Sequence, residues 1–436
     1  MVNTEMRAAM VEVLARIRIL APLRLRGFRI LWAGMSISLI GDGLTLVAIA
    51  WQVYQLSNVP TALGITMMAM SVPQILLLLF GGIVSDRFDR RRVMIGADLV
   101  RGLALLGMGT LSITGVLELW HMAVIAAVYG AGNAFFGPAF EGLVPELVPE
   151  ELLAPANSLD HFMRQFAGRL VGPALGGWII AAAGVGWAFV FDAISFAVSI
   201  ACLVRLGDVR GALRIGHDSH ASVSIWTELS EGFAFVRSNA WLWGTFSAAT
   251  LAYLVFLGPA EVLLPYLVKN ELGGSAADLG AVLAVGGLGA VTASLVIAQR
   301  GMPSHNMTFV FIAWSLSTPA VAAYGLAHSS WQVMLACFVF NAFETAGLIV
   351  WLTTKQSFVP TRLIGRVSSL GRLIATGLMP LSYALAGPAA ELFGTRTTLV
   401  GAGLLGAAIT FAFLFLPGVR ALDGVPPIRS GGLPAT

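Results

Sequence analysis

The stretch Gly82-Ile-Val-Ser-Asp86-Arg87-Phe-Asp89-Arg90-Arg91-Arg92 decides the fold, because it puts a dense group of charges between two apolar runs of membrane-spanning length. Only 11% of the 436 residues are charged, so this group is exceptional within the chain. Charges between two membrane-spanning segments are costly at membrane depth and should lie in a short loop in water. Their excess of arginine predicts a cytoplasmic loop, because cytoplasmic loops are enriched in Lys and Arg.

The composition supports a membrane protein. The chain is 57% hydrophobic, whereas soluble proteins are about 45–50% apolar and about 25% charged. The net charge of +3 is small and indicates no nucleic-acid partner. Cys202 and Cys337 lie inside apolar runs, so they predict neither a disulfide framework nor a metal site.

The lengths of the apolar runs predict an all-α protein, because a helix needs about 20 apolar residues to cross roughly 30 Å of hydrocarbon. The twelve predicted spans are residues 28–55, 61–84, 93–115, 121–142, 157–183, 187–205, 240–268, 278–299, 307–327, 331–354, 366–390 and 397–417. They form an N-terminal half (28–205) and a C-terminal half (240–417). An amphipathic segment (1–27), a central loop (206–239) and a tail (418–436) are predicted to lie in the cytoplasm.

The distribution of Lys and Arg predicts the orientation. With both termini inside, the outer connections hold only Lys269 and Arg396. The expected location is a bacterial inner membrane. Within the central loop, residues 226–236 have the pattern of an amphipathic surface helix. His217 and His220 lie there too, and we interpret them as solvated residues, because a zinc site needs further ligands.

The two halves repeat one another. Leu147-Val148-Pro149 corresponds to Phe358-Val359-Pro360, and Ser158 to Ser369, both at an offset of 211 residues. The copies precede the fifth and eleventh spans. Two such halves, related by an axis along the membrane normal, are the pattern of the major facilitator transporters.

The opening stretch resembles the loop signature of the major facilitator superfamily, G-x-x-x-D-R-x-G-R-R/K. Gly82, Asp86, Arg87, Arg90 and Arg91 match, whereas Asp89 replaces the second glycine. The resemblance implies a conformational latch between the halves. Asp98 and Arg101 are expected to be latch partners or a structural pair, as are Asp160 and Arg164. Gly82 is expected to allow the close approach of a neighbouring helix.

The fifth span contains a second motif, Gly168-Arg-Leu-Val-Gly172-Pro173-Ala-Leu-Gly176-Gly177. Gly168, Gly172 and Gly176 lie on one helix face and allow close helix packing, and Pro173 should distort the helix near Arg169. The motif resembles the G-x-x-x-G-P-x-x-G-G motif of the superfamily's antiporters. The surrounding residues resemble bacterial macrolide-type efflux pumps and the enterobactin exporter.

Ionisable residues at membrane depth cost about 2.5–3.5 kcal/mol each, so they are functional candidates. Asp42, Glu344 and Arg169 lie near the middle of their spans and are our candidates for proton coupling. Asp192 and Glu261 are expected near the outer interface, where they could reach water. Span four lacks the buried arginine that drug–proton antiporters usually carry, and Arg101 or Arg169 could substitute.

Aromatic and amide side chains on the expected cavity spans predict a site for bulky amphipathic or cationic molecules. The candidates are Trp51, Tyr54, Asn133, Phe136, Tyr253, Asn341 and Phe343. A siderophore, being anionic, would instead need a basic cavity.

The sequence therefore predicts a proton-coupled antiporter that exports amphipathic small molecules such as drugs. A siderophore or metabolite exporter of the same superfamily is the alternative. An enzyme is less well supported, because the chain has no Walker A, HExxH or nucleophile-elbow motif. A channel would need no latch. We expect a monomer in the lipid bilayer, with no cofactor beyond the proton gradient.

Overall fold

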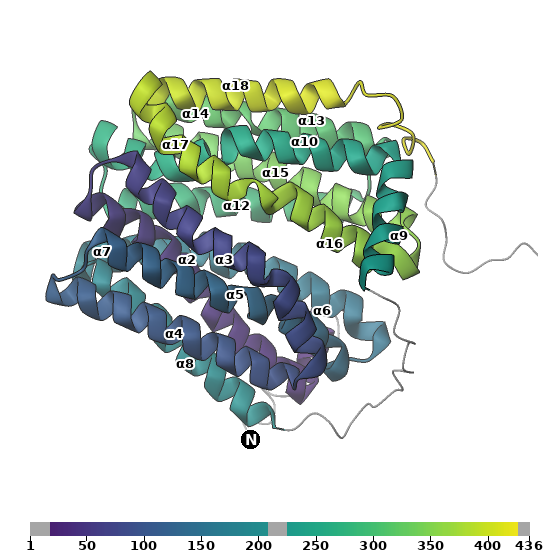
Figure 1. The fold of residues 1–436 in the computed structure, drawn as a ribbon, viewed down its shortest axis with the longest axis horizontal. Coiled ribbons are helices and arrows are strands. Elements are labelled where there is room, and N and C mark those ends of the chain that lie inside the picture. Colours follow the sequence, from purple (N-terminus) through teal and green to yellow (C-terminus); the bar gives the residue numbers. More distant parts are fainter. Residues whose placement is uncertain (1–17, 208–224, 426–436) are drawn as a thin grey trace, which may run out of the picture. The chain divides into compact units, whose positions relative to one another are not determined.

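The computed structural model describes residues 18–207 and 225–425, and within them every regular element is a helix. Twelve helical segments are long and apolar enough to cross a membrane (Figure 1), which confirms the twelve predicted spans. The chain divides into two compact units, Met1–His217 with Gly274–Ala284, and Asp218–Gly273 with Val285–Thr436. Each unit has its own apolar core.

The first unit holds the first six spans. After the short helix η1 (Arg18–Arg24), its elements are α2 (Arg26–Leu56), α3 (Pro60–Arg87), α4 (Arg90–Thr114), α5 (Leu119–Leu147), α6 (Glu150–Met163), η2 (Arg164–Val171), α7 (Gly172–Ala183) and α8 (Val185–Leu206). Helix α2 packs against α8, and α4 packs against both α5 and α8. These four helices position the polar site described below.

The second unit contains most of the remaining elements. They are α9 (Ile225–Ser238), α10 (Ala240–Gly258), η4 (Pro259–Leu263), α11 (Leu264–Tyr266), η5 (Leu267–Glu271), α12 (Ala276–Arg300), α13 (Asn306–Ser317), α14 (Pro319–Leu326), α15 (Ser330–Phe358), α16 (Thr361–Gly377), α17 (Met379–Phe393) and α18 (Thr395–Phe413). The first residues of α12 belong to the first unit. The predicted surface helix is confirmed as α9, and Glu231 on it pairs with Arg366 on α16 at 2.5 Å.

The charged loop of the opening stretch consists only of Phe88 and Asp89, because α3 ends at Arg87 and α4 begins at Arg90. Asp89 caps α4 by accepting a hydrogen bond from the backbone N–H of Arg92 at 3.3 Å. Aspartate is among the best N-cap residues, which accounts for its presence where the family signature has glycine.

Arg90 fastens the start of α4 to α5. Its Nη1 donates to the carbonyl of Gly142 at 2.6 Å and pairs with Glu146 at 2.7 Å. The side chain of Asp86 lies outside the described residues, and so do His217 and His220.

Gly82 does not have the expected packing role. A Cβ atom at Gly82 would meet nothing within 4 Å, whereas one at Gly81 would collide with the backbone of Ala134 on α5. The prediction for Gly82 is wrong by one residue, because adjacent residues of a helix point in different directions.

The motif glycines of the fifth span confirm the predicted close packing. A Cβ at Gly172 would lie 2.6 Å from the carbonyl oxygen of Ile40 and 2.7 Å from Cα of Gly43, both on α2. Gly177 points elsewhere and packs against Gly280 of α12, with 2.9 Å between its Cβ position and the Gly280 Cα. The π-helical segment η2 ends directly before Gly172 and Pro173. Pro173 lacks the N–H that an α-helix would direct at the Arg169 carbonyl, which explains the distortion predicted there.

Candidate functional site

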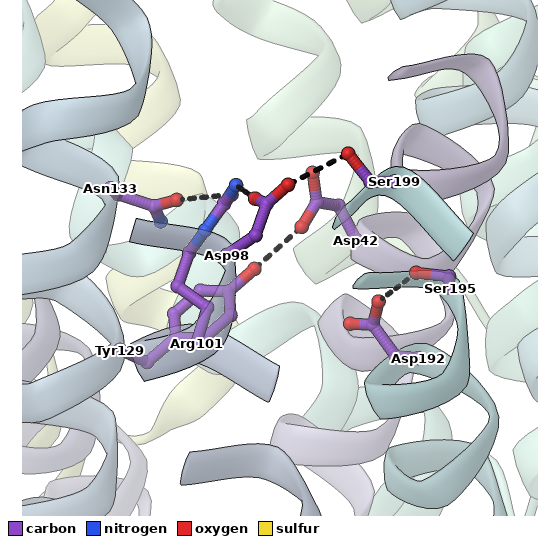
Figure 2. A network of polar contacts seen from close by, with 8 residues as sticks. All are labelled: Asp42, Asp98, Arg101, Tyr129, Asn133, Asp192, Ser195 and Ser199. Atoms are coloured by element: carbon purple, nitrogen blue, oxygen red, sulfur yellow. Dashed lines mark hydrogen bonds and ion pairs between the residues drawn. The ribbon is translucent and has the colours of Figure 1, made fainter. Parts of the chain in front are cut away.

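A buried polar network lies among α2, α4, α5 and α8 (Figure 2). Its centre is the ion pair of Asp98 and Arg101, one turn apart on α4, with exposed side-chain fractions of 0% and 3%. Asp98 also accepts from the Ser199 hydroxyl at 2.7 Å. Arg101 also donates to the amide oxygen of Asn133 at 2.9 Å. The predicted pairing of Asp98 with Arg101 is therefore confirmed, and its contacts join three helices.

The Arg101 guanidinium lies between two aromatic rings. Its carbon is 4.4 Å from the ring centroids of both Phe136 on α5 and Phe196 on α8. Such cation–π contacts stabilise a desolvated guanidinium. Among the described residues, the Nε of Arg101 has no hydrogen-bond partner. Arg101 thus brings a buried cation from the third span into contact with the fourth, the span whose own arginine is missing.

Asp42 lies on α2 beside this ion pair and is half-buried. The phenolic hydroxyl of Tyr129 on α5 donates to its carboxylate at 2.6 Å. The sequence placed Asp42 among the proton-coupling candidates but assigned no partner to it.

Asp192 corrects a prediction. Its side chain is completely buried and does not reach water at an interface. It accepts hydrogen bonds from the hydroxyls of Thr45 on α2 at 2.5 Å and of Ser195 at 2.8 Å. Hydropathy does not show that this face of α8 packs against α2. By contrast, Glu261 is exposed and accepts from the Tyr383 hydroxyl at 2.6 Å.

The second unit contains a similar pair. The hydroxyl of Tyr253 on α10 donates to the carboxylate of Glu344 on α15 at 3.1 Å. Both residues line a cavity of about 20 Å³, together with Phe256, Trp314 and Ser317. A volume of this size holds about one water molecule. Glu344 is therefore the proton-coupling candidate with a water-sized space beside it.

The two carboxylate–tyrosine pairs use corresponding helices in the opposite order. In the first unit the carboxylate (Asp42) is on the first span and the tyrosine (Tyr129) on the fourth. In the second unit the tyrosine (Tyr253) is on the first span of its half and the carboxylate (Glu344) on the fourth. Tyr253 follows Asp42 by 211 residues, the offset of the sequence repeat. Glu344 follows Tyr129 by 215 residues, one helical turn beyond that offset.

The other candidates lie in varied surroundings. Arg169 lies on η2 with an exposed side chain, and Asp160 and Arg164 form the predicted ion pair at 2.9 Å.

The predicted cavity residues also differ in their surroundings. Tyr54 is a core residue with 1% exposure, and Asn341 donates to the carbonyl of Cys337 on its own helix at 2.9 Å. The remaining predicted cavity residues are the half-buried Trp51 and the exposed Phe343.

Comparisons with known proteins agree with this architecture. The family model described as "Transmembrane secretion effector" matches residues 17–430. The chain is 27% identical to the uncharacterized major facilitator transporter YfiS of Bacillus subtilis, over 87% of this chain and 90% of that protein. It is 27% identical to the multidrug efflux pump Tap of Mycolicibacterium fortuitum, over 92% and 97%. It is 22% identical to macrolide efflux protein A of Streptococcus pyogenes, over 91% and 97%.

Solved structures show the same fold. A bacterial homologue of the iron transporter ferroportin, in its inward-facing state, superposes with a TM-score of 0.67 at 17% identity, over 89% of this chain and 98% of that one. A D323A mutant of the nucleoside transporter NupG gives 0.67 at 12% identity, over the same shares. With the family match along almost the whole sequence, the chain belongs to the transmembrane secretion effector family of the major facilitator superfamily and is a membrane transporter, not an enzyme.

Proposed function

We propose that the protein is a proton-coupled antiporter that exports amphipathic small molecules by alternating access. The observation that carries this proposal is the carboxylate–tyrosine pair in each unit, Asp42 with Tyr129 and Glu344 with Tyr253. Both carboxyl groups are half-buried in helices of membrane-spanning length, where an ionisable side chain is costly and therefore a functional candidate. The tyrosine hydroxyl can donate to the carboxylate and accept from the carboxylic acid, so it serves both protonation states.

The surroundings of Glu344 favour a substrate that carries an amine or another cationic group. Tyr253, Phe256 and Trp314 line the water-sized cavity beside the carboxylate. They would meet a substrate once this cavity widens during transport, and aromatic rings with a carboxylate suit organic cations. The buried cation of the first unit, Arg101, is already paired with Asp98. A drug-like cation is therefore a better fit than an anionic siderophore, whose export is the alternative. The relatives named as multidrug and macrolide efflux proteins support the same class.

Transport in inside-out vesicles tests the coupling. An imposed pH gradient should drive accumulation of a fluorescent organic cation, and an uncoupler should abolish it. Asp42→Asn and Glu344→Gln should each bring the accumulation down to the level seen with the uncoupler. Glu151→Gln is the matched control, because Glu151 is exposed in the first turn of α6. Unchanged proton coupling in both Asp42→Asn and Glu344→Gln would contradict the proposal, and uptake without any gradient dependence would indicate a channel.

We further propose that the junction of α3 and α4 is the cytoplasmic latch, with Asp86 and Arg87 at the end of α3 as its first members. Asp86→Asn should slow transport while leaving the amount of protein in the membrane unchanged, since the substitution removes one charge and no apolar surface. Asp89→Asn is the control, because asparagine caps a helix as well as aspartate does and Asp89 acts as the cap of α4. The fluorescence of a fused reporter would give the amount of protein in the membrane. If Asp86→Asn then transports at the wild-type rate, the segment acts only as a topological anchor.

A further inference from the structure

We propose that Asp192 holds a proton in the resting protein and exchanges it with Asp42 during transport. This inference rests on the proposed proton coupling and adds a second carboxyl group to it. In the part of the chain that the structure describes, Asp192 is fully buried, and its hydrogen bonds come from the hydroxyls of Thr45 and Ser195. An ionised carboxylate without a cation is very costly in such a place, so the neutral acid is the favoured form.

The charges around Asp192 lead to the same conclusion. The groups that act on it from the packed helices are Asp42 on α2, Arg101 on α4 and the Tyr129 hydroxyl on α5, and Asp98 is the ion-pair partner of the same Arg101. Three carboxyl groups thus share one guanidinium, and Arg101 is committed to Asp98. Ionising the other two would leave two like charges uncompensated, each at a cost of several kcal/mol. At least one of Asp42 and Asp192 must therefore carry a proton.

Burial and partners decide between the two. Asp42 is half-buried, whereas Asp192 has an exposed fraction of 0%. Both hydroxyl partners of Asp192 can either donate or accept, so the protonated acid can bond to one while it accepts from the other. We therefore place the resting proton on Asp192.

The backbone of α2 is shaped to admit this carboxyl group. A Cβ atom at Gly41 would overlap the Asp192 carboxylate and the Ser195 hydroxyl. Gly41 directly precedes Asp42, so one turn of α2 both admits Asp192 and presents the neighbouring carboxylate, with Thr45 one turn further on. Asp192 thus lies against the turn of α2 from which Asp42 projects toward the Tyr129 hydroxyl, as Figure 2 shows.

The proposed step is a simple proton transfer. The O–H bond of the Asp192 acid breaks, an O–H bond forms on the Asp42 carboxylate, and the negative charge moves from α2 to α8. Asp42 then releases its proton to water on one side while Asp192 regains a proton from the other side, so one of the two carboxyl groups stays protonated and the cycle closes. No redox partner is needed.

Infrared spectroscopy of the purified protein in lipid nanodiscs tests the inference without measuring transport. A protonated carboxyl gives a C=O band that shifts in heavy water. We expect this band near neutral pH in the wild type and in Asp42→Asn, and the loss of one carboxyl component of it in Asp192→Asn. Thr45→Ala should shift the frequency of that component, because Asp192 then loses one hydrogen bond. This second variant keeps the test valid if Asp192→Asn folds poorly.

An unchanged band in Asp192→Asn, or no frequency shift in Thr45→Ala, would overturn the assignment. An ionised Asp192 would contribute no such component. If the component is found but transport is independent of the proton gradient, then the proposed function fails and the protonation of Asp192 stands. The two outcomes are thus separable.

Discussion

Replacing Arg101 by glutamine is expected to lower the free energy of unfolding by about 3–5 kcal/mol, because it leaves the buried Asp98 carboxylate without its cation. Adding Asp98→Asn to the same chain should return much of that loss, since both charges are then gone and amide groups remain to bond with Ser199 and Asn133. The expected pattern is therefore one damaging single variant and a double variant close to the wild type in stability.

Thermal unfolding of the purified proteins would measure this pattern. Arg164→Gln is the matched control, because it breaks another ion pair between residues one turn apart, whose arginine and aspartate side chains are 44% and 20% exposed. Exposed pairs contribute about 0–1 kcal/mol. A stability of Arg101→Gln equal to that of Arg164→Gln would show that the pair on α4 is not desolvated. A double variant less stable than both single variants would show that the charges do more than neutralise each other.

The sequence alone predicted the spans because a membrane span needs only length and apolar composition. It also predicted the pairing of Asp98 with Arg101, because residues three apart lie on one helix face. It did not predict what faces that pair, since Asn133 and Ser199 come from helices 32 and 101 residues away. Contacts at such separations depend on the rotation of each helix about its axis, and a nearly uniform apolar run contains little information about that rotation.

Asp192 and the glycines at 81 and 82 illustrate the same limit. The place of Asp192 along α8 was readable from the sequence, but its burial by α2 was not. Gly81 and Gly82 are neighbours in sequence, yet only Gly81 meets the backbone of α5. Motifs predicted packing better where they repeat, because Gly168, Gly172 and Gly176 together define a helix face.

Gly172→Leu is expected to reduce transport by about tenfold or more, which corresponds to at least about 1.4 kcal/mol in an activation barrier. The glycine lies directly against α2, where a Cβ would meet the Ile40 carbonyl oxygen and the Gly43 Cα at 2.6 and 2.7 Å. Those are backbone atoms, which cannot move aside as a side chain can, so the two helices must separate. Overpacking of this kind costs about 1–3 kcal/mol, and the strain falls next to Asp42 on α2.

Ala174→Leu provides the comparison, because Ala174 is exposed two residues further along the same helix. This substitution also adds apolar volume to α7, but none of it at the contact with α2, so transport should stay near the wild-type rate. Initial rates in vesicles, divided by the amount of inserted protein, would compare the two variants. Equal transport rates of the two variants would mean that the glycine face serves helix packing and has no further role in transport. Loss in Gly172→Leu alone would link transport to the close contact of α7 with α2 beside Asp42, because Ala174→Leu leaves that contact unchanged.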